Sequence, residues 1–431
     1  SNELNDSNNN IFLGNKSGYK GIKSDTNIFI GHFSGYENLR GIENIYIGYK
    51  AGLNCNSDDN IFIGMYNGLN IVGKQNTIMG NWSNINSAEN CYFNTIMGFN
   101  TGQNSSGNYN ILFGYQSNTK GNNNILLGNN ISHKSNLLDD CIYIGNNIGQ
   151  QFLTINNIRI GSNVIDNIDF NQSGNNIMLG HYSNNNLNTG TNNITIGSKS
   201  SFLNVTGHNN LSIGTDSNYN NLGSNNISFG YKSLYYNNGN NNLVIGNNAA
   251  QNILNSNNNL ILGNYALTNC NTSNILENTV IGTNSLYNNN NCSYTTILGN
   301  NSGYNSLYCY KNIFIGYKSG YNCISTSESI LIGYYAGYNK DTHNTSKNNI
   351  IIGNSSGSHI TSGENNIFLG NKSGINNQIG NSNIMIGDKT GYNTNSNQNI
   401  FLGNHSGFFN YNGERNIFVG SSSGFNNQSG S

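Results

Sequence analysis

A glycine that closes a three-residue apolar cluster returns 25 times along the 431 residues, from Gly14 to Gly420. The 24 intervals between these glycines cover 406 residues, so the mean period is 16.9 residues. Fixed periods of this size are typical of solenoids, in which each repeat is one coil that buries its apolar face only against neighbouring coils. The period therefore predicts an all-β fold, a parallel β-solenoid (β-roll) of about 25 coils.

The composition is compatible with such a fold but not with a disordered chain. Glycine occurs 53 times, proline is absent and only 9% of the residues are charged, which is a polar, low-complexity composition. However, 11% of the residues are aromatic, and apolar clusters return at even spacing. Disordered chains lack both features. We therefore assign the polar residues to turns and the apolar clusters to a regular core.

No linker, charge block or change of composition interrupts the array, which predicts one repeat domain over residues 1–431. Within it, the coils are regular over residues 1–117 and 291–431. Over residues 118–290 they are more degenerate, because most lack a second glycine four residues after the first.

An asparagine stands directly before the apolar triplet in 22 of the 25 repeats. Stacked coils bring equivalent residues to about 4.8 Å from one another, where side-chain amides can hydrogen-bond along the solenoid axis. The clearest members of this expected asparagine ladder are Asn27, Asn44, Asn312, Asn366, Asn383 and Asn416.

The triplet itself does not alternate between apolar and polar residues, as a strand with one buried face should. We expect its first and third residues to fill the coil and its middle residue to face outward. The outward ladder would include Phe12, Phe29, Tyr46, Phe62, Phe314, Phe368, Phe401 and Phe418. Such a stripe is too large to leave in water, which predicts a trimer formed around it. Contacts between chains should weaken where the middle residue is Arg159, Thr195, Ser212 or Ser228.

A tyrosine often follows the second glycine of the repeat, and these tyrosines should stack along one corner of the coil. They are Tyr19, Tyr36, Tyr304, Tyr321, Tyr338 and Tyr392. A ladder that covers the corner is the favoured interpretation, and a surface that binds sugars or another protein is the alternative.

Catalytic and metal-binding patterns are weak. The seven cysteines form no C-x-x-C pair and are interpreted as packing residues, and the seven histidines as exposed turn residues. Asp139 and Asp140 lack an identifiable carboxylate partner, and Gly420–Gly424 fits G-x-S-x-G only as a repeat corner. We predict no catalytic residues, no metal, no cofactor and no enzymatic activity.

The net charge of −1, with lysines and arginines scattered singly, argues against nucleic acid as a partner. No apolar run is long enough to span a membrane.

The unit N-I-F-I-G-x-x-S-G-Y-N resembles the N-T-F-I-G-x-x-A-G repeats of surface fibre proteins from bacteria, phages and large viruses. The clearest matches run from Asn27 to Tyr36, Asn312 to Tyr321 and Asn383 to Tyr392. The unit is more loosely similar to the head repeats of trimeric autotransporter adhesins. Both resemblances cover nearly the whole chain, and both imply a trimeric fibre or adhesin head on a cell or virion surface.

The sequence therefore predicts a structural or adhesive extracellular protein. Its main partner would be a second and third copy of itself, and a host glycan or surface receptor is a further candidate partner. Because neither end has an evident capping repeat, end-to-end assembly into filaments is also expected. The alternatives are a β-helix that binds or degrades polysaccharides and, less favoured, an ice-binding protein.

Overall fold

The computed structural model describes residues 8–85, 91–103, 105–131, 138–149, 154–164, 173–187, 189–270, 275–340 and 344–430. The strands of these residues pair in parallel with the equivalent strands of neighbouring coils, one repeat away. The fold is a parallel β-solenoid with a period near 17 residues, which confirms the predicted fold class. No helix occurs in the described part of the chain, and hence none that is long and apolar enough to cross a membrane.

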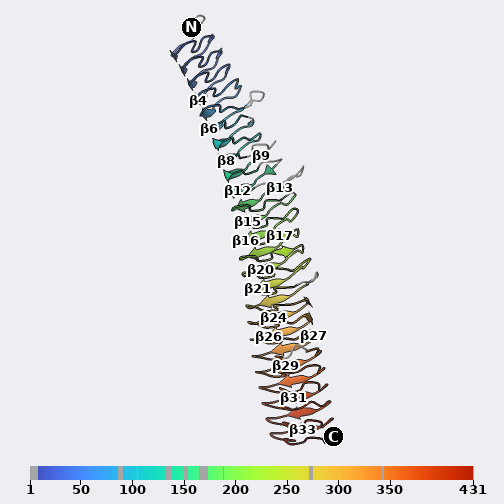
Figure 1. Cartoon of the computed structure of the whole chain (residues 1–431). Helices are drawn as coiled ribbons and strands as arrows, with labels where there is room; N and C mark the ends of the chain where they lie inside the picture. The colour runs from blue at the N-terminus through green and yellow to red at the C-terminus, as the bar shows by residue number, and fades with distance from the viewer. Residues whose placement is uncertain are drawn as a thin grey trace. The chain divides into compact units, whose positions relative to one another are not determined.

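The chain falls into two compact units, Ser1–Asn209 and Asn210–Ser431. In each unit the coils stack so that their main strands follow one another along one side (Figure 1).

The main sheet of the first unit contains one strand from each coil. Its strands are β1 (Ile11–Leu13), β2 (Ile28–Ile30), β3 (Ile45–Ile47), β4 (Ile61–Ile63), β5 (Thr77–Met79), β6 (Thr95–Phe99), β7 (Ile111–Tyr115), β8 (Ile125–Asn129), β10 (Ile142–Asn146), β12 (Ile158–Ser162), β14 (Ile177–Leu179) and β15 (Ile194–Ile196). A smaller second sheet contains β9 (Leu138–Asp139), β11 (Thr154–Ile155) and β13 (Ser173–Gly174).

The second unit is built in the same way. Its main strands are β16 (Leu211–Ile213), β18 (Ile227–Phe229), β20 (Leu243–Ile245), β21 (Leu260–Leu262), β22 (Thr279–Ile281), β24 (Thr296–Leu298), β26 (Ile313–Ile315), β28 (Ile330–Ile332), β29 (Ile350–Ile352), β30 (Ile367–Leu369), β31 (Ile384–Ile386), β32 (Ile400–Leu402) and β33 (Ile417–Val419). Two smaller sheets pair β17 (Asn220–Asn221) with β19 (Tyr236–Asn237), and β23 (Asn291–Ser293) with β25 (Tyr308–Tyr310) and β27 (Ser325–Ser327).

The pairing register places equivalent positions of successive coils side by side. Ile28 is opposite Ile45, and Ile30 is opposite Ile47, so each position of the repeat forms a column along the unit. The glycine after the triplet makes the corner: Gly316 has a φ of 129°, and a Cβ there would collide with the carbonyl oxygen of Gly333 in the next coil. Only glycine tolerates that combination of conformation and close approach.

The asparagines before the triplets lie inside the coils and form a hydrogen-bonded ladder. Asn44 Nδ2 donates to Asn27 Oδ1 at 3.1 Å and to the Ser57 carbonyl at 2.8 Å, while Asn44 Oδ1 accepts from the Asn60 backbone N–H at 2.9 Å. Asn383 donates in the same way to Asn366. The amides thus satisfy buried polar groups where the chain turns into most of the main strands.

The expected orientation of the triplet is wrong. The middle residue points into the coil and the two flanking residues point outward. The side chains of Phe29, Tyr46, Phe62, Phe314, Phe368 and Phe401 are fully buried within the single chain. Phe12 and Phe418, in the first and last coils, are partly buried and pack against the same cores.

The physical reason lies in the asparagine ladder. Side chains alternate along a strand, so Asn27 and Phe29 must share one face, and Ile28 and Ile30 the other. Because the asparagine amide is buried against backbone carbonyls of its coil, the middle residue is buried with it. In the first coils the inward rings of Phe12, Phe29, Tyr46 and Phe62 stack with centroid distances of 4.8–5.1 Å.

Candidate functional site

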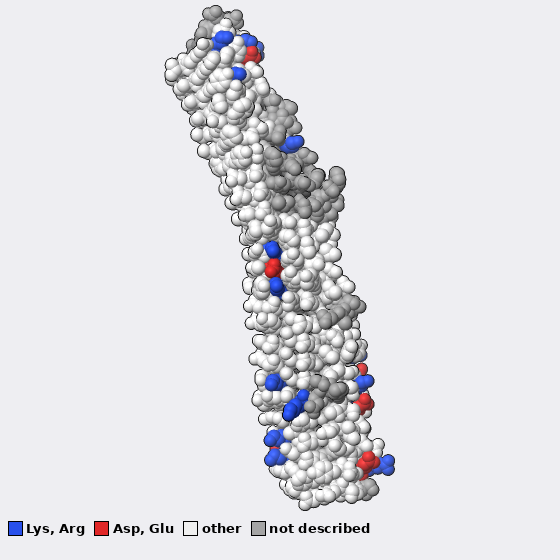
Figure 2. Space-filling view, in the orientation of Figure 1, with Lys and Arg blue, Asp and Glu red and all other residues white. Residues whose placement is uncertain are grey.

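The first and third residues of every triplet form what we call the outer apolar face of the main sheet. These positions contain only Ile, Leu, Val, Met, Phe or Thr in all 25 coils. Many remain substantially exposed, such as Ile160 at 39%, Ile245 at 42% and Phe229 at 49%. Figure 2 shows that charged residues are sparse and gathered in small groups on the visible surface.

The middle residue of the triplet, which points inward, varies more in chemical character than the two outward residues. Arg159, Thr195, Ser212 and Ser228 all occupy inward positions and are fully buried. The outward orientation that we expected for these four side chains is therefore wrong, because they do not reach the outer face. The hydroxyls are bonded inside the coil: Thr195 Oγ1 lies 2.8 Å from Ser183 Oγ, and Ser228 Oγ donates to the Ser233 carbonyl at 2.8 Å.

The corner tyrosines stack along each unit. Tyr19 and Tyr36 have ring centroids 5.5 Å apart, Tyr304 and Tyr321 are 5.1 Å apart, and Tyr321 and Tyr338 are 5.4 Å apart. Tyr392 continues the same pattern with Phe408 at 4.8 Å. The faces of these rings are largely occupied by one another, which leaves mainly their edges for a ligand.

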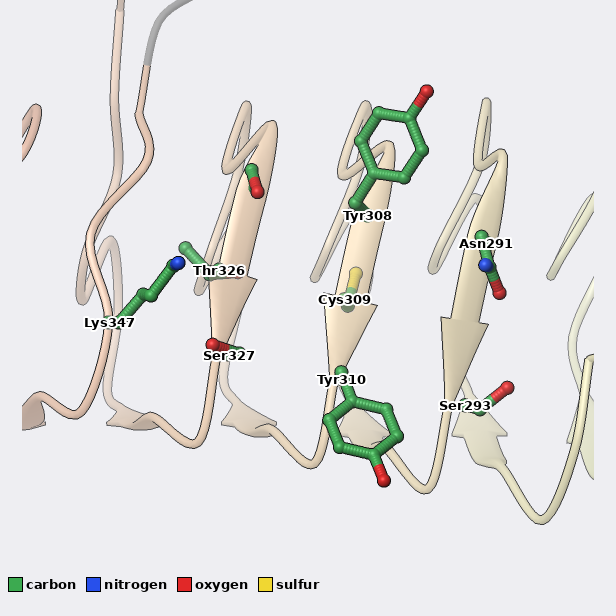
Figure 3. A pocket seen from close by; sticks show the side chains of 9 residues that line it. Asn291, Ser293, Tyr308, Cys309, Tyr310, Thr326, Ser327 and Lys347 are labelled. Atoms are coloured by element: carbon green, nitrogen blue, oxygen red, sulfur yellow. The ribbon is translucent and has the colours of Figure 1, made fainter.

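A hollow of about 340 Å³ lies on the second sheet formed by β23, β25 and β27. We call it the tyrosine trough. Its lining consists of Asn291, Ser293, Tyr308, Cys309, Tyr310, Ser325, Thr326, Ser327 and Lys347. Figure 3 shows the Tyr308 and Tyr310 rings leaving opposite ends of β25, with Lys347 reaching toward Thr326 at one end of the hollow.

The alternation of β25 explains this arrangement. Tyr308 and Tyr310 point outward and are 52% and 45% exposed, while Cys309 between them points inward and is buried. The outward positions of the neighbouring coils hold only asparagine and serine. The two rings therefore stand above shorter neighbours. Sequence reasoning missed this site, although the alternating segments at 291–293, 308–310 and 325–327 carry the signal.

A disulfide lies beneath the trough. Cys292 and Cys309 are opposite each other on β23 and β25 and are joined as a disulfide. The interpretation of all seven cysteines as simple packing residues is thus wrong for this pair, because a separation of 17 residues equals one coil. The side chains of Cys55, Cys91, Cys141, Cys270 and Cys323 are buried, and burial raises the pKa of the Cys323 thiol to about 12.

The remaining candidate residues form no larger cluster. Asp139 accepts a hydrogen bond from the Asn122 backbone N–H at 2.7 Å, and Asp140 one from the Asn123 amide at 2.9 Å. His133 and His343 lie outside the described residues. Within the described ranges, no group of three or more His, Cys, Asp or Glu side chains could hold a metal ion.

These features define the class of protein: a tandem-repeat β-solenoid with an apolar outer face and an aromatic trough. No family model, curated protein or solved structure matches the chain.

Proposed function

We propose that this chain is a structural protein that associates with copies of itself through the outer apolar face and forms the shaft or head of an extracellular fibre on a cell or virion surface. One observation carries the proposal. Across 25 coils the outward positions of the triplet never hold a charged residue, whereas the inward position accepts arginine, serine and threonine. In a solenoid that stays alone in water, we expect the opposite distribution.

The size of the outer apolar face supports a stable interface. The twelve coils of the first unit present 24 outward triplet side chains, all of them exposed or half-buried, compared with about 20–30 residues per side in standard interfaces. Contiguous exposed apolar patches of this size usually mark interaction sites.

The expected assembly is a homotrimer. A rotation axis parallel to the stacking direction lets each coil meet its equivalents in the other copies, so a face that repeats in register is used along its whole length. Stacking of successive trimers along the same axis would extend the assembly into a filament.

Light scattering coupled to size-exclusion chromatography tests the proposal. The expected mass is about three times the 46.9 kDa of one chain. The double variant Ile313→Lys/Ile350→Lys places two charges on the outer apolar face and should lower the mass. The control Ile379→Lys changes an isoleucine that is 55% exposed away from this face, and should leave it unchanged.

A wild-type monomer at micromolar concentration would overturn the proposal. A dimer would correct the number of copies, and the double variant would then show whether the outer apolar face holds it together. Circular dichroism of each variant confirms that the coils still form. Electron microscopy of the purified wild-type protein would separate discrete rods from filaments.

A further inference from the structure

We propose that the tyrosine trough binds a linear glycan that carries a carboxylate, with the sugar rings against Tyr308 and Tyr310 and the carboxylate at Lys347. This binding site does not depend on the proposed self-association. The second sheet is joined to the main sheet through a corner at Tyr294 and Thr295, so the trough lies on another side of the coil from the outer apolar face. Figure 3 shows the main strands set apart from the strands that carry the trough.

The arrangement of the two tyrosine rings suits an extended polymer. The two rings arise from residues two apart on one strand, so their backbones are about 7 Å apart. Figure 3 shows the two rings pointing away from each other, so the surface between them is open and a single extended chain can lie on it in contact with both rings.

The groups that line the tyrosine trough favour a sugar ligand over a peptide. An extended peptide is usually bound by pairing with a free sheet edge. Here the backbone is already used between coils, as when the Tyr308 N–H donates to the Ile324 carbonyl at 2.8 Å and the Ser325 N–H to the Asn344 carbonyl at 2.9 Å. The trough instead offers hydroxyl and amide side chains.

Asn291, Ser325 and Ser327 make no side-chain hydrogen bond with any described residue. Their hydroxyl and amide groups both donate and accept, as sugar hydroxyls do. Exposed aromatic rings beside a few such polar groups are typical of small-molecule binding sites.

The charge of the trough limits the ligand further. The Lys347 ammonium forms no ion pair within the described chain, and Lys311 lies 4.9 Å from the centre of the Tyr310 ring. Glu328 occupies the position equivalent to Lys311 in the next coil, because its backbone N–H donates to the Tyr310 carbonyl at 2.9 Å, and its negative charge counters one of these two positive charges. A single net positive charge suits an isolated carboxylate, whereas a nucleic acid needs several phosphate contacts.

Among the described residues, the second-sheet strands are longest at the trough, and a disulfide links two of them. β23, β25 and β27 have three residues each, whereas the other second-sheet strands have two. The disulfide between Cys292 and Cys309 links the first two of these strands directly below the hollow. A site held rigid before binding loses less entropy when the ligand arrives.

Isothermal titration of the full-length protein with two probes tests the inference. The probes are hexasaccharides of a polyuronate and of a neutral β-linked glucan. The wild type should bind the polyuronate more tightly. Tyr308→Ala/Tyr310→Ala should weaken both interactions by at least about tenfold, which corresponds to ~1.4 kcal/mol.

Lys347→Gln should weaken polyuronate binding by about threefold or more and leave glucan binding unchanged, because it removes only the charge. The control Tyr265→Ala changes a tyrosine that is 45% exposed outside the trough and should bind both probes like the wild type.

Failure of the wild type to bind either probe would overturn the inference. It would also be overturned if the double tyrosine variant, with an unchanged circular dichroism spectrum, bound as well as the wild type. Equal affinity of the wild type for both probes would refute the role of Lys347. Because the trough variants leave the outer apolar face intact, their mass by light scattering should equal that of the wild type, which separates this test from that of self-association.

Discussion

Replacing Phe62 with alanine should destabilise the coils around β4 without changing the way copies associate. The Phe62 side chain is fully buried, and its ring stacks on Tyr46 with a centroid distance of 4.9 Å and an angle of 6°. On the opposite side, Ile78 occupies the same inward column. Alanine would therefore leave a ring-sized cavity between two neighbouring coils.

The magnitude follows from burial. Phenylalanine to alanine substitutions in a packed core cost about 3–5 kcal/mol, because apolar contact is lost and the cavity collapses only partly. At about 1.4 kcal/mol per factor of ten, local opening of these coils should rise by roughly two to four orders of magnitude. In a repeat protein each coil contacts only its neighbours, so the effect should decrease with distance from β4.

Native-state hydrogen exchange measures this opening coil by coil. The amides of β3, β4 and β5 should exchange much faster in Phe62→Ala, while those of β30 to β32 should keep their wild-type rates. The matched control is Ile63→Ala, which truncates a half-buried outward residue of the same strand and should have a smaller effect. If Phe62→Ala left exchange unchanged but lowered the assembly mass, the ring would face outward and our assignment of the core would be wrong.

Three further outcomes are expected. Asn44→Ala removes two donated hydrogen bonds and leaves the Asn60 N–H without its acceptor. The free energy of local opening, measured by hydrogen exchange, should fall by about 2–4 kcal/mol, and a fall below about 0.5 kcal/mol would contradict the role of the ladder. Gly316→Ala should reduce folded yield and thermal stability more than an alanine at an exposed turn position, because the added Cβ meets the Gly333 carbonyl oxygen. Cys323 should resist alkylation at pH 8 in the folded protein, since burial raises its thiol pKa from 9.0 to about 12. The raised pKa of Cys323 stabilises the fold below pH 9, and this stabilisation is lost as the pH rises toward 12. The free energy of unfolding, measured by chemical denaturation, should therefore decline less over that range in Cys323→Ser than in the wild type.

The trough shows why part of the site escaped prediction. Its residues come from four coils, and Tyr308 and Tyr310 stand above their surroundings only because the neighbouring coils hold asparagine and serine at the same register. When the repeats are aligned on the apolar triplet, the segment before the triplet is ignored. This segment contains Cys292 and Cys309, whose separation of 17 residues already indicates that they occupy the same position in successive coils.

The repeat itself was sufficient to predict a parallel solenoid, the corner glycines and an asparagine ladder, because a fixed period forces equivalent residues into columns about 4.8 Å apart. It did not decide which face of each strand is the core. A triplet that is apolar at all three positions has no contrast between its faces, so either orientation satisfied the pattern. The tertiary structure decided it through Asn27 and its equivalents: their amides bond to backbone carbonyls inside the coil, and strand alternation then turns Phe29 inward and Ile28 and Ile30 outward.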